Sequence, residues 1–279
     1  MMQPMSPRLR WTLARAMPVA AIALACLAAA VCAKPASRPA GPADLRLRVV
    51  RAYPHDPKAF TQGLLFWGGK LYESTGLFAR SSLRRVDLAS GLVERSSSLP
   101  ADWFGEGLAL VGQRLFQLTW KNRKVLVWDL ATLKQQTELT YDGEGWGLCF
   151  DGRHLVMSNG SDKLVLRNPD TFAVEGELPV RLAGRPLANL NELECAGSVI
   201  YANVWQDQHI ARIDRTSGRV TGWIDAAGLL EPAEAAQADV LNGIASLGST
   251  GHLLVTGKLW PRLFEVEIVP AATHASEGK

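Results

Sequence analysis

Glu106 is the residue of this chain whose surroundings best suit acid–base chemistry. Glycines flank it in Gly105-Glu106-Gly107, and glycine permits close approach of a backbone or a ligand. A glutamate enclosed by apolar groups has a raised pKa, and one carboxyl can then accept and later donate a proton. We therefore predict that Glu106 is a catalytic acid and base. The alternative is a carboxylate that only caps strand ends.

Further candidates occupy two equivalent positions of a repeated strand pattern. The first position comes just before the Gly-Leu or similar pair that opens one strand of each repeat. The second position is the last residue of the next strand in the same repeat. Indoles with a few convergent polar groups are typical of a ligand pocket. The predicted pocket residues beside Glu106 are Gln62, Trp120, Trp146, Asn191, Trp205, Asn242 and Lys258. The alternatives are packing for the indoles, a solvated charge for the lysine and backbone hydrogen bonding for the carboxamides.

Other chemistries find no support in the sequence. Glu73, Glu192 and Glu194 lie in the same motifs, and we expect them to be structural. The five histidines share no metal-ligand spacing, and there is no Cys-x-x-Cys, no Gly-x-Ser-x-Gly elbow, no phosphate loop and no dinucleotide fingerprint. We therefore predict no protein metal ligands and no zinc, serine-hydrolase or nucleotide chemistry.

The elements that position these residues are short strands with a long period. Apolar runs separated by Gly, Asn and Asp recur in five units, whose second strands begin at residues 71, 115, 155, 200 and 253. This period is typical of propeller blades. We predict an all-β, five-bladed β-propeller over residues 45–268, closed by strand 45–53 of the mature chain, which completes the last blade. An open β-sandwich, the alternative, would not show the period.

One segment interrupts the strands. Residues 225–241 contain helix formers without strand alternation. We predict a surface loop with a helical turn there, of the kind that often covers a site.

Residues 1–33 have the pattern of a signal peptide. Arg8, Arg10 and Arg15 precede an apolar run that is shorter than the roughly 20 residues of a membrane span, and Val31-Cys32-Ala33 suits a signal peptidase. A retained anchor and a lipoprotein are the alternatives. We predict a flexible spacer at 34–44, a flexible tail at 269–279 and a periplasmic or secreted protein that does not bind the membrane after cleavage.

Charge and cysteines agree with export. The chain has 30 Lys and Arg against 27 Asp and Glu, and the leader accounts for the excess of three arginines. A near-neutral mature chain does not favour nucleic-acid binding, and we expect a monomer. Cys149 and Cys195 remain after cleavage, on innermost strands of successive units at nearly the same depth. In an oxidising compartment they are candidates for a disulfide, with two buried thiols as the alternative.

The chain resembles the plant and bacterial glutaminyl-peptide cyclotransferases. The resemblance runs from about residue 48 to residue 268 and rests on motifs that occur in order. The motifs are Tyr53-Pro54-His55-Asp56-Pro57, Phe60-Thr61-Gln62-Gly63-Leu64, Phe104-Gly105-Glu106-Gly107-Leu108, Leu118-Thr119-Trp120, Gly145-Trp146-Gly147-Leu148, Leu190-Asn191-Glu192-Leu193-Glu194, Asn203-Val204-Trp205, Leu241-Asn242-Gly243-Ile244-Ala245 and Thr256-Gly257-Lys258-Leu259-Trp260-Pro261.

This resemblance implies a five-bladed propeller that converts the N-terminal glutamine of peptides or proteins to pyroglutamate and releases ammonia. Glu106 matches the essential glutamate of the family, and the family's pocket matches the candidates named above except Asn242. Phe104 stands where some members have a smaller polar residue, which bears on the shape of the pocket entrance. The chemistry requires no cofactor, and the question of a structural calcium ion is left open.

Two other functions fit some of these residues. A calcium-dependent propeller lactonase or esterase could use Glu106, Asn191 and Asn242 as oxygen ligands. A non-catalytic secreted propeller that binds peptides or glycans is the other alternative, since a fold does not determine a function.

Overall fold

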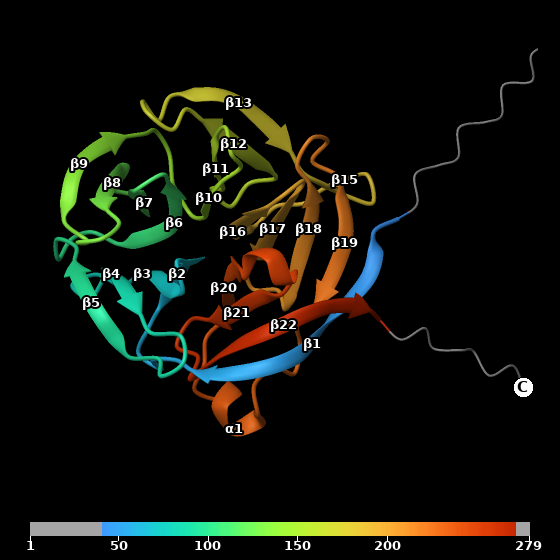
Figure 1. The fold of residues 1–279 in the computed structure, drawn as a ribbon. Coiled ribbons are helices and arrows are strands. Elements are labelled where there is room, and N and C mark those ends of the chain that lie inside the picture. Colours follow the sequence, from blue (N-terminus) through green and yellow to red (C-terminus); the bar gives the residue numbers. More distant parts are fainter. Residues whose placement is uncertain (1–40, 272–279) are drawn as a thin grey trace, which may run out of the picture. The chain divides into compact units, whose positions relative to one another are not determined.

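The computed structural model describes residues 41–271, which are nearly all strand and turn (Figure 1). Helical structure in this range is confined to α1 (Pro232–Ala235) and a 3-10 turn at Gly248–Thr250. The prediction of an all-β chain with a helical turn in segment 225–241 is confirmed. None of the described helices is long and apolar enough to cross a membrane. The predicted signal peptide 1–33 lies outside the described residues.

Three four-stranded antiparallel sheets follow one another along the chain. The first contains β2 (Thr61–Trp67), β3 (Lys70–Thr75), β4 (Ser82–Val86) and β5 (Val93–Ser98). The second contains β6 (Gly105–Val111), β7 (Arg114–Thr119), β8 (Lys124–Asp129) and β9 (Gln135–Thr140). The third contains β10 (Leu148–Phe150), β11 (Leu155–Met157), β12 (Lys163–Arg167) and β13 (Val174–Pro179). A short hairpin, β14 (Arg181–Leu182) and β15 (Arg185–Pro186), comes next.

The remaining strands form one eight-stranded sheet. One half contains β16 (Leu190–Ala196), β17 (Val199–Val204), β18 (His209–Asp214) and β19 (Val220–Asp225). The other half contains β20 (Leu241–Ser246), β21 (Leu253–Gly257), β22 (Arg262–Pro270) and β1 (Ala43–Pro54). The pairing of β1 with β22 is antiparallel, as predicted for strand 45–53, and a short parallel pairing with β19 joins the two halves.

The strand boundaries differ slightly from the prediction. The residues Ala43 and Asp44 belong to β1 rather than to a flexible spacer, because they pair with β19. At the other end, β22 continues to Pro270, which pairs with Leu45, and the N–H of Ala271 donates to the carbonyl of Asp44 over 3.0 Å. The paired strands β1 and β22 therefore extend into the segments 34–44 and 269–279, which the sequence pattern indicated as flexible.

The sheets stand around a ring, as expected for a β-propeller, with β2, β6, β10, β16 and β20 innermost (Figure 1). Glycines allow these strands to approach one another. A Cβ atom on Gly147 would lie 2.0 Å from the carbonyl oxygen of Asn191, and one on Gly63 would lie 2.5 Å from the backbone nitrogen of Leu108. Such contacts exclude any side chain at these positions.

The equivalent position of β16 is occupied by Glu192 instead of glycine. This buried carboxylate accepts the N–H of Leu64 in β2 over 3.2 Å and that of Ile244 in β20 over 2.8 Å. Glu194 similarly accepts the N–H of Ser246 over 3.0 Å. Both glutamates are structural, as expected, since they bind backbone donors of other innermost strands.

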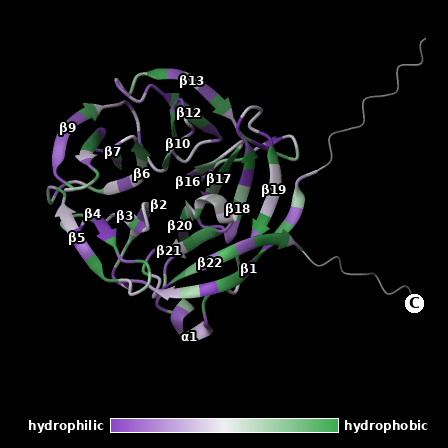
Figure 2. Ribbon diagram, viewed as in Figure 1, coloured by the Kyte–Doolittle hydropathy of each residue, from purple (hydrophilic) through white to green (hydrophobic). Residues whose placement is uncertain are grey.

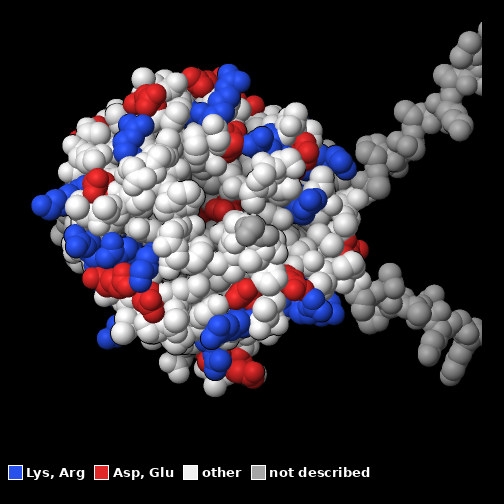
Figure 3. Space-filling model, viewed as in Figure 1, with Lys and Arg blue, Asp and Glu red and all other residues white. Residues whose placement is uncertain are grey.

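The apolar core lies between adjacent sheets. Leu83 of the first sheet packs with Leu115 and Leu126 of the second, and Phe116 of the second packs with Leu155 of the third. Figure 2 shows apolar and polar residues interleaved along the strands, which is the pattern expected when only part of each strand is buried. On the face that Figure 3 shows, basic and acidic side chains are interspersed.

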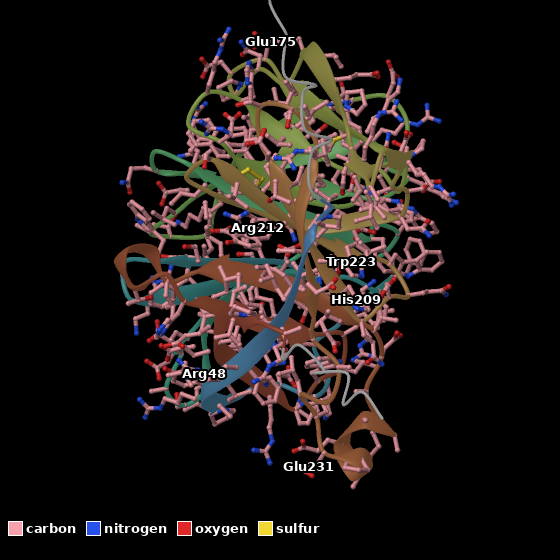
Figure 4. All side chains as sticks on the ribbon, turned by 90° about the vertical axis from the view of Figure 1, so that its right-hand side faces the viewer. Arg48, Glu175, His209, Arg212, Trp223 and Glu231 are labelled. Atoms are coloured by element: carbon pink, nitrogen blue, oxygen red, sulfur yellow. A yellow bond between two sulfur atoms is a disulfide. The ribbon has the colours of Figure 1, made fainter. Side chains whose placement is uncertain are left out.

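A disulfide joins two innermost strands of this ring. Cys149 of β10 and Cys195 of β16 are bonded, with their Cα atoms 5.4 Å apart (yellow in Figure 4). The bond links the third sheet to the eight-stranded sheet.

A buried ion pair links β3 of the first sheet to the residue that follows β1 of the eight-stranded sheet. His55 follows β1, and its Nδ1 lies 2.7 Å from the carbonyl oxygen of Trp260 while its Nε2 lies 3.1 Å from Oε1 of Glu73 in β3. Both partners are acceptors, so the arrangement favours the protonated imidazole, in which both ring nitrogens donate. Burial alone lowers the pKa of His55, but Glu73 and the Trp260 carbonyl outweigh burial and raise it. Thr61 also donates to Glu73 over 2.7 Å, which confirms a structural role for this glutamate.

We predict that His55→Ala lowers the free energy of unfolding by about 3 kcal/mol, because it removes the cation that hydrogen-bonds Oε1 of the buried Glu73 and leaves only Arg84, 3.9 Å from Oε2, to offset this charge. Since the folded pKa of His55 is raised, its contribution is complete below the unfolded pKa of about 6.5 and disappears as pH rises through the folded pKa. Denaturant unfolding at several pH values measures both effects.

The matched control is His209→Ala. His209 also pairs with a carboxylate, Asp207 at 2.6 Å, but it is partly exposed on β18, where it stacks on Trp223 (Figure 4). Equal losses of stability in the two variants would contradict the larger contribution expected from the buried pair of His55 and Glu73.

Candidate functional site

A cavity of about 350 Å³ lies at the end of the ring where the innermost strands begin. Both predicted positions meet here, since one precedes or opens each innermost strand and the other follows the strand paired with it. The lining residues are Phe60, Gln62, Phe104, Glu106, Trp120, Trp146, Asn191, Trp205 and Lys258. The structure therefore brings together Glu106 and all but one of the predicted pocket residues.

Asn242 is the predicted residue that does not line the cavity. Its side-chain amide is buried behind Gln62 and donates to the carbonyl of Thr61 over 2.9 Å and to Oε1 of Gln62 over 3.1 Å. The reason is that β20 packs against β2, so this carboxamide satisfies groups of the neighbouring strand. It orients Gln62, whose NH₂ group remains available to the cavity.

Glu106 is a buried carboxyl without a protein partner. Within residues 41–271 no hydrogen bond to its carboxylate forms, although its backbone carbonyl accepts the hydroxyl of Ser74. Burial raises the pKa of Glu106 well above its ordinary value, the nearby charge of Lys258 opposes this rise, and that of Glu144 reinforces it. The carboxyl is thus desolvated and free to exchange a proton with a ligand in the cavity.

Lys258 faces this carboxyl from the last unit. Its ammonium lies 4.9 Å from the centre of the Phe60 ring, and burial lowers its pKa against the opposing charges of Glu106 and Asp239. Backbone hydrogen bonds of 2.9 Å run from Lys258 to the carbonyl of Val240 and from Asp239 to the carbonyl of Lys258. The predicted loop 225–241 therefore holds Lys258 in place through its last residues.

Aromatic rings complete the wall. Trp146 and Trp205 meet edge to face with centres 5.7 Å apart, and Phe104 meets Trp120 in the same way at 5.8 Å. Gly160 makes room for this arrangement, since a Cβ there would lie 2.7 Å from the Trp146 ring and its φ of +79° is unfavourable for other residues. The rings are therefore fixed by mutual packing.

Glu144 is a site residue that the sequence interpretation missed. Its Oε2 accepts the indole N–H of Trp120 over 2.7 Å and that of Trp146 over 3.2 Å. Lys121 lies 3.5 Å from Oε1 and 4.0 Å from the centre of the Trp120 ring. The signal was present, since Gly143-Glu144-Gly145 repeats the Gly-Glu-Gly sequence around Glu106.

Among residues 41–271, no group of three or more His, Cys, Asp or Glu side chains could hold a metal ion. The NH₂ group of Asn242, a candidate calcium ligand beside Glu106 and Asn191, donates to β2, whereas its Oδ1, the atom that could bind calcium, is buried without a hydrogen-bond partner among the described residues.

A family model described as glutamine cyclotransferase matches residues 19–268. The chain belongs to this family. It is 43% identical over 235 residues to a glutaminyl-peptide cyclotransferase of Arabidopsis thaliana, and the match covers 82% of this chain and 73% of that protein. The crystal structure of Myxococcus xanthus glutaminyl cyclase is similar with a TM-score of 0.78 and 42% identity, over 83% of this chain and all of that one. The resemblance inferred from the motifs is confirmed.

We predict that Glu144→Ala changes the near-ultraviolet circular dichroism of the indoles, because Trp120 and Trp146 lose their shared acceptor. Glu144→Gln should retain most of the wild-type spectrum, since its amide oxygen can still accept. Glu138→Ala is the control, since Glu138 pairs with Lys124 on an outer strand. A Glu144→Ala spectrum identical to that of the control would contradict this role.

Proposed function

We propose that Glu106 is the acid and base of a glutaminyl-peptide cyclotransferase reaction in this cavity. The family and both relatives identify the activity, in which an N-terminal glutamine becomes pyroglutamate and ammonia leaves. The observation that supports Glu106 is its free, buried carboxyl in the cavity, whereas Glu73, Glu192 and Glu194 are engaged in structural hydrogen bonds.

The reaction requires one group to handle a proton twice. The substrate's α-amine attacks the carbon of its own γ-carboxamide and gives a proton to the ionised Glu106. When the tetrahedral intermediate collapses, the bond to the carboxamide nitrogen breaks, and Glu106 returns the proton to this nitrogen, which leaves as ammonia. Glu106 therefore ends in its starting state, and a raised pKa suits both transfers near neutral pH.

The other lining residues would bind and orient the substrate. The ring closes within one molecule, so holding the glutamine folded over the reacting carbon supplies much of the rate. Trp120, Trp146 and Trp205 offer rigid apolar walls for this. The ammonium of Lys258 or the amide N–H groups of Gln62 and Asn191 could stabilise the oxyanion of the tetrahedral intermediate.

The same proposal includes a five-bladed ring. The eight-stranded sheet divides into β16–β19 and β20–β22 with β1, each with the four strands of a blade. Contacts between innermost strands pass from β2 through β6, β10, β16 and β20 back to β2, which supports this count.

We also propose export of a monomer and chemistry without a cofactor. The disulfide supports an oxidising compartment. N-terminal sequencing of the protein from the periplasm or medium should therefore begin at Lys34.

Activity should survive a zinc chelator, because Glu106 and Lys258 supply the proton transfer and the positive charge. Restoration of lost activity by added zinc would overturn this mechanism, and restoration by calcium alone would instead indicate a structural ion.

We predict that Glu106→Gln lowers kcat for ammonia release from a glutaminyl peptide by at least ~10²-fold, the scale for a lost acid and base. Glu194→Gln is the matched control. Glu194 is a partly buried carboxyl that lines a cavity at the other end of the innermost strands, and the glutamine keeps an acceptor for the N–H of Ser246. A coupled ammonia assay compares the two variants.

The pH profile gives a second measurement on the wild type. Both an ionised Glu106 and a neutral substrate α-amine are required, so the acid side of kcat/KM should show two ionisations. Because the pKa of Glu106 is raised, both should lie well above pH 4.5. An acid side that shows the substrate amine alone down to pH 4.5, or normal turnover by a folded Glu106→Gln protein, would refute the assignment.

A further inference from the structure

Phe78 is a large apolar side chain displayed to solvent beside the cavity. Its side chain is 56% exposed, and its ring meets that of the lining residue Phe104 at 5.5 Å and 75°. Phe104 in turn meets Phe60 at 6.0 Å and Trp120 at 5.8 Å. Phe78 thus extends the aromatic wall of the cavity outward.

Among residues 41–271, the other exposed large apolar side chains lie elsewhere or already line the cavity. Val49, Val50, Leu92, Val93 and Val174 lie in or next to the outer strands β1, β5 and β13. Trp67 lines the cavity at the far end of the innermost strands, and Trp205 already belongs to the site. Phe78 is therefore the exposed apolar group that a molecule protruding from the site would meet on the Phe104 side.

The loop that presents Phe78 is held in an unfavourable backbone conformation. Its neighbours Leu77 and Ala79 have φ angles of 82° and 60°, which are rare for residues other than glycine. The loop is bound at Ala79, whose N–H donates to the carbonyl of Ala101 over 2.7 Å, and at Leu77, whose carbonyl accepts the hydroxyl of Ser81 over 2.8 Å. Strain of this kind persists where the surroundings fix it, and it is concentrated at ligand-binding sites.

A peptide substrate needs a second contact region at the cavity mouth. The amine and carboxamide of its first residue must both lie at Glu106, so the peptide chain after this residue has to leave through the opening. We propose that Phe78 and Phe104 form a subsite for the side chain of the second substrate residue, and that this subsite favours apolar and aromatic side chains. This inference rests on the proposed function and specifies its substrate class.

The test compares glutaminyl-phenylalanine amide with glutaminyl-glycine amide, using kcat/KM for ammonia release. The wild type should prefer the phenylalanine peptide by about 10-fold, the upper range for a gained aromatic contact. In Phe78→Ser this ratio should fall to about 1, and in Phe78→Leu, which stays apolar, it should remain intermediate. The matched control is Trp67→Ser, which removes a similarly exposed aromatic ring, 53% exposed, from the far cavity and should keep the wild-type ratio.

The outcomes separate the subsite from the proposed function. Ammonia release from both peptides with equal kcat/KM in the wild type would overturn the subsite and leave the proposed function standing. A wild-type ratio in a folded Phe78→Ser protein would do the same. Absence of ammonia from both peptides with the wild type would overturn the proposed function, and the subsite with it.

Discussion

The close approach of the innermost strands at the ring axis is the constraint on which the rest of this structure depends. Where Gly63 and Gly147 stand, the neighbouring backbone leaves no room for a Cβ atom. Glu192 replaces the glycine at one such point, and its carboxylate accepts N–H groups of two other innermost strands, β2 and β20. Near the axis the innermost strands are thus joined by main-chain contacts and by buried polar side chains such as Glu192 and Asn203, whereas the apolar core lies between the sheets.

This closure determines the chemistry at the end of the axis. At four of the five repeated positions the residue before the close contact points into the same small space, so Gln62, Glu106, Trp146 and Asn191 converge although they are far apart in the chain. Convergence also desolvates them, which raises the pKa of Glu106 and lowers that of Lys258. The reactivity proposed for Glu106 therefore follows from its position in the ring.

Much of the fold and of the site could be predicted from the sequence because both repeat with one period. The register of the repeats placed Glu106 and Lys258 in one cavity and β1 beside β22. Glu144 escaped prediction because it lies two residues before the repeated position and acts through side-chain direction, which periodicity does not determine. Asn242 occupies the repeated position, yet its amide turns toward β2. The exposure of Phe78 depends on the backbone of one loop, which hydropathy cannot indicate.

The pairing of β1 with β22 also constrains the order of folding. These are the first and the last of the described strands, and Tyr53 pairs with Leu263. Nascent β1 must therefore wait, unpaired, until nearly the whole domain has been synthesised, and each earlier sheet can form while the ring is still open. Closing such a long loop is a slow, entropically costly step. The seam at β1 and β22 is then the last part of the ring to form, and a chain interrupted before β22 would remain an open array with a free strand edge.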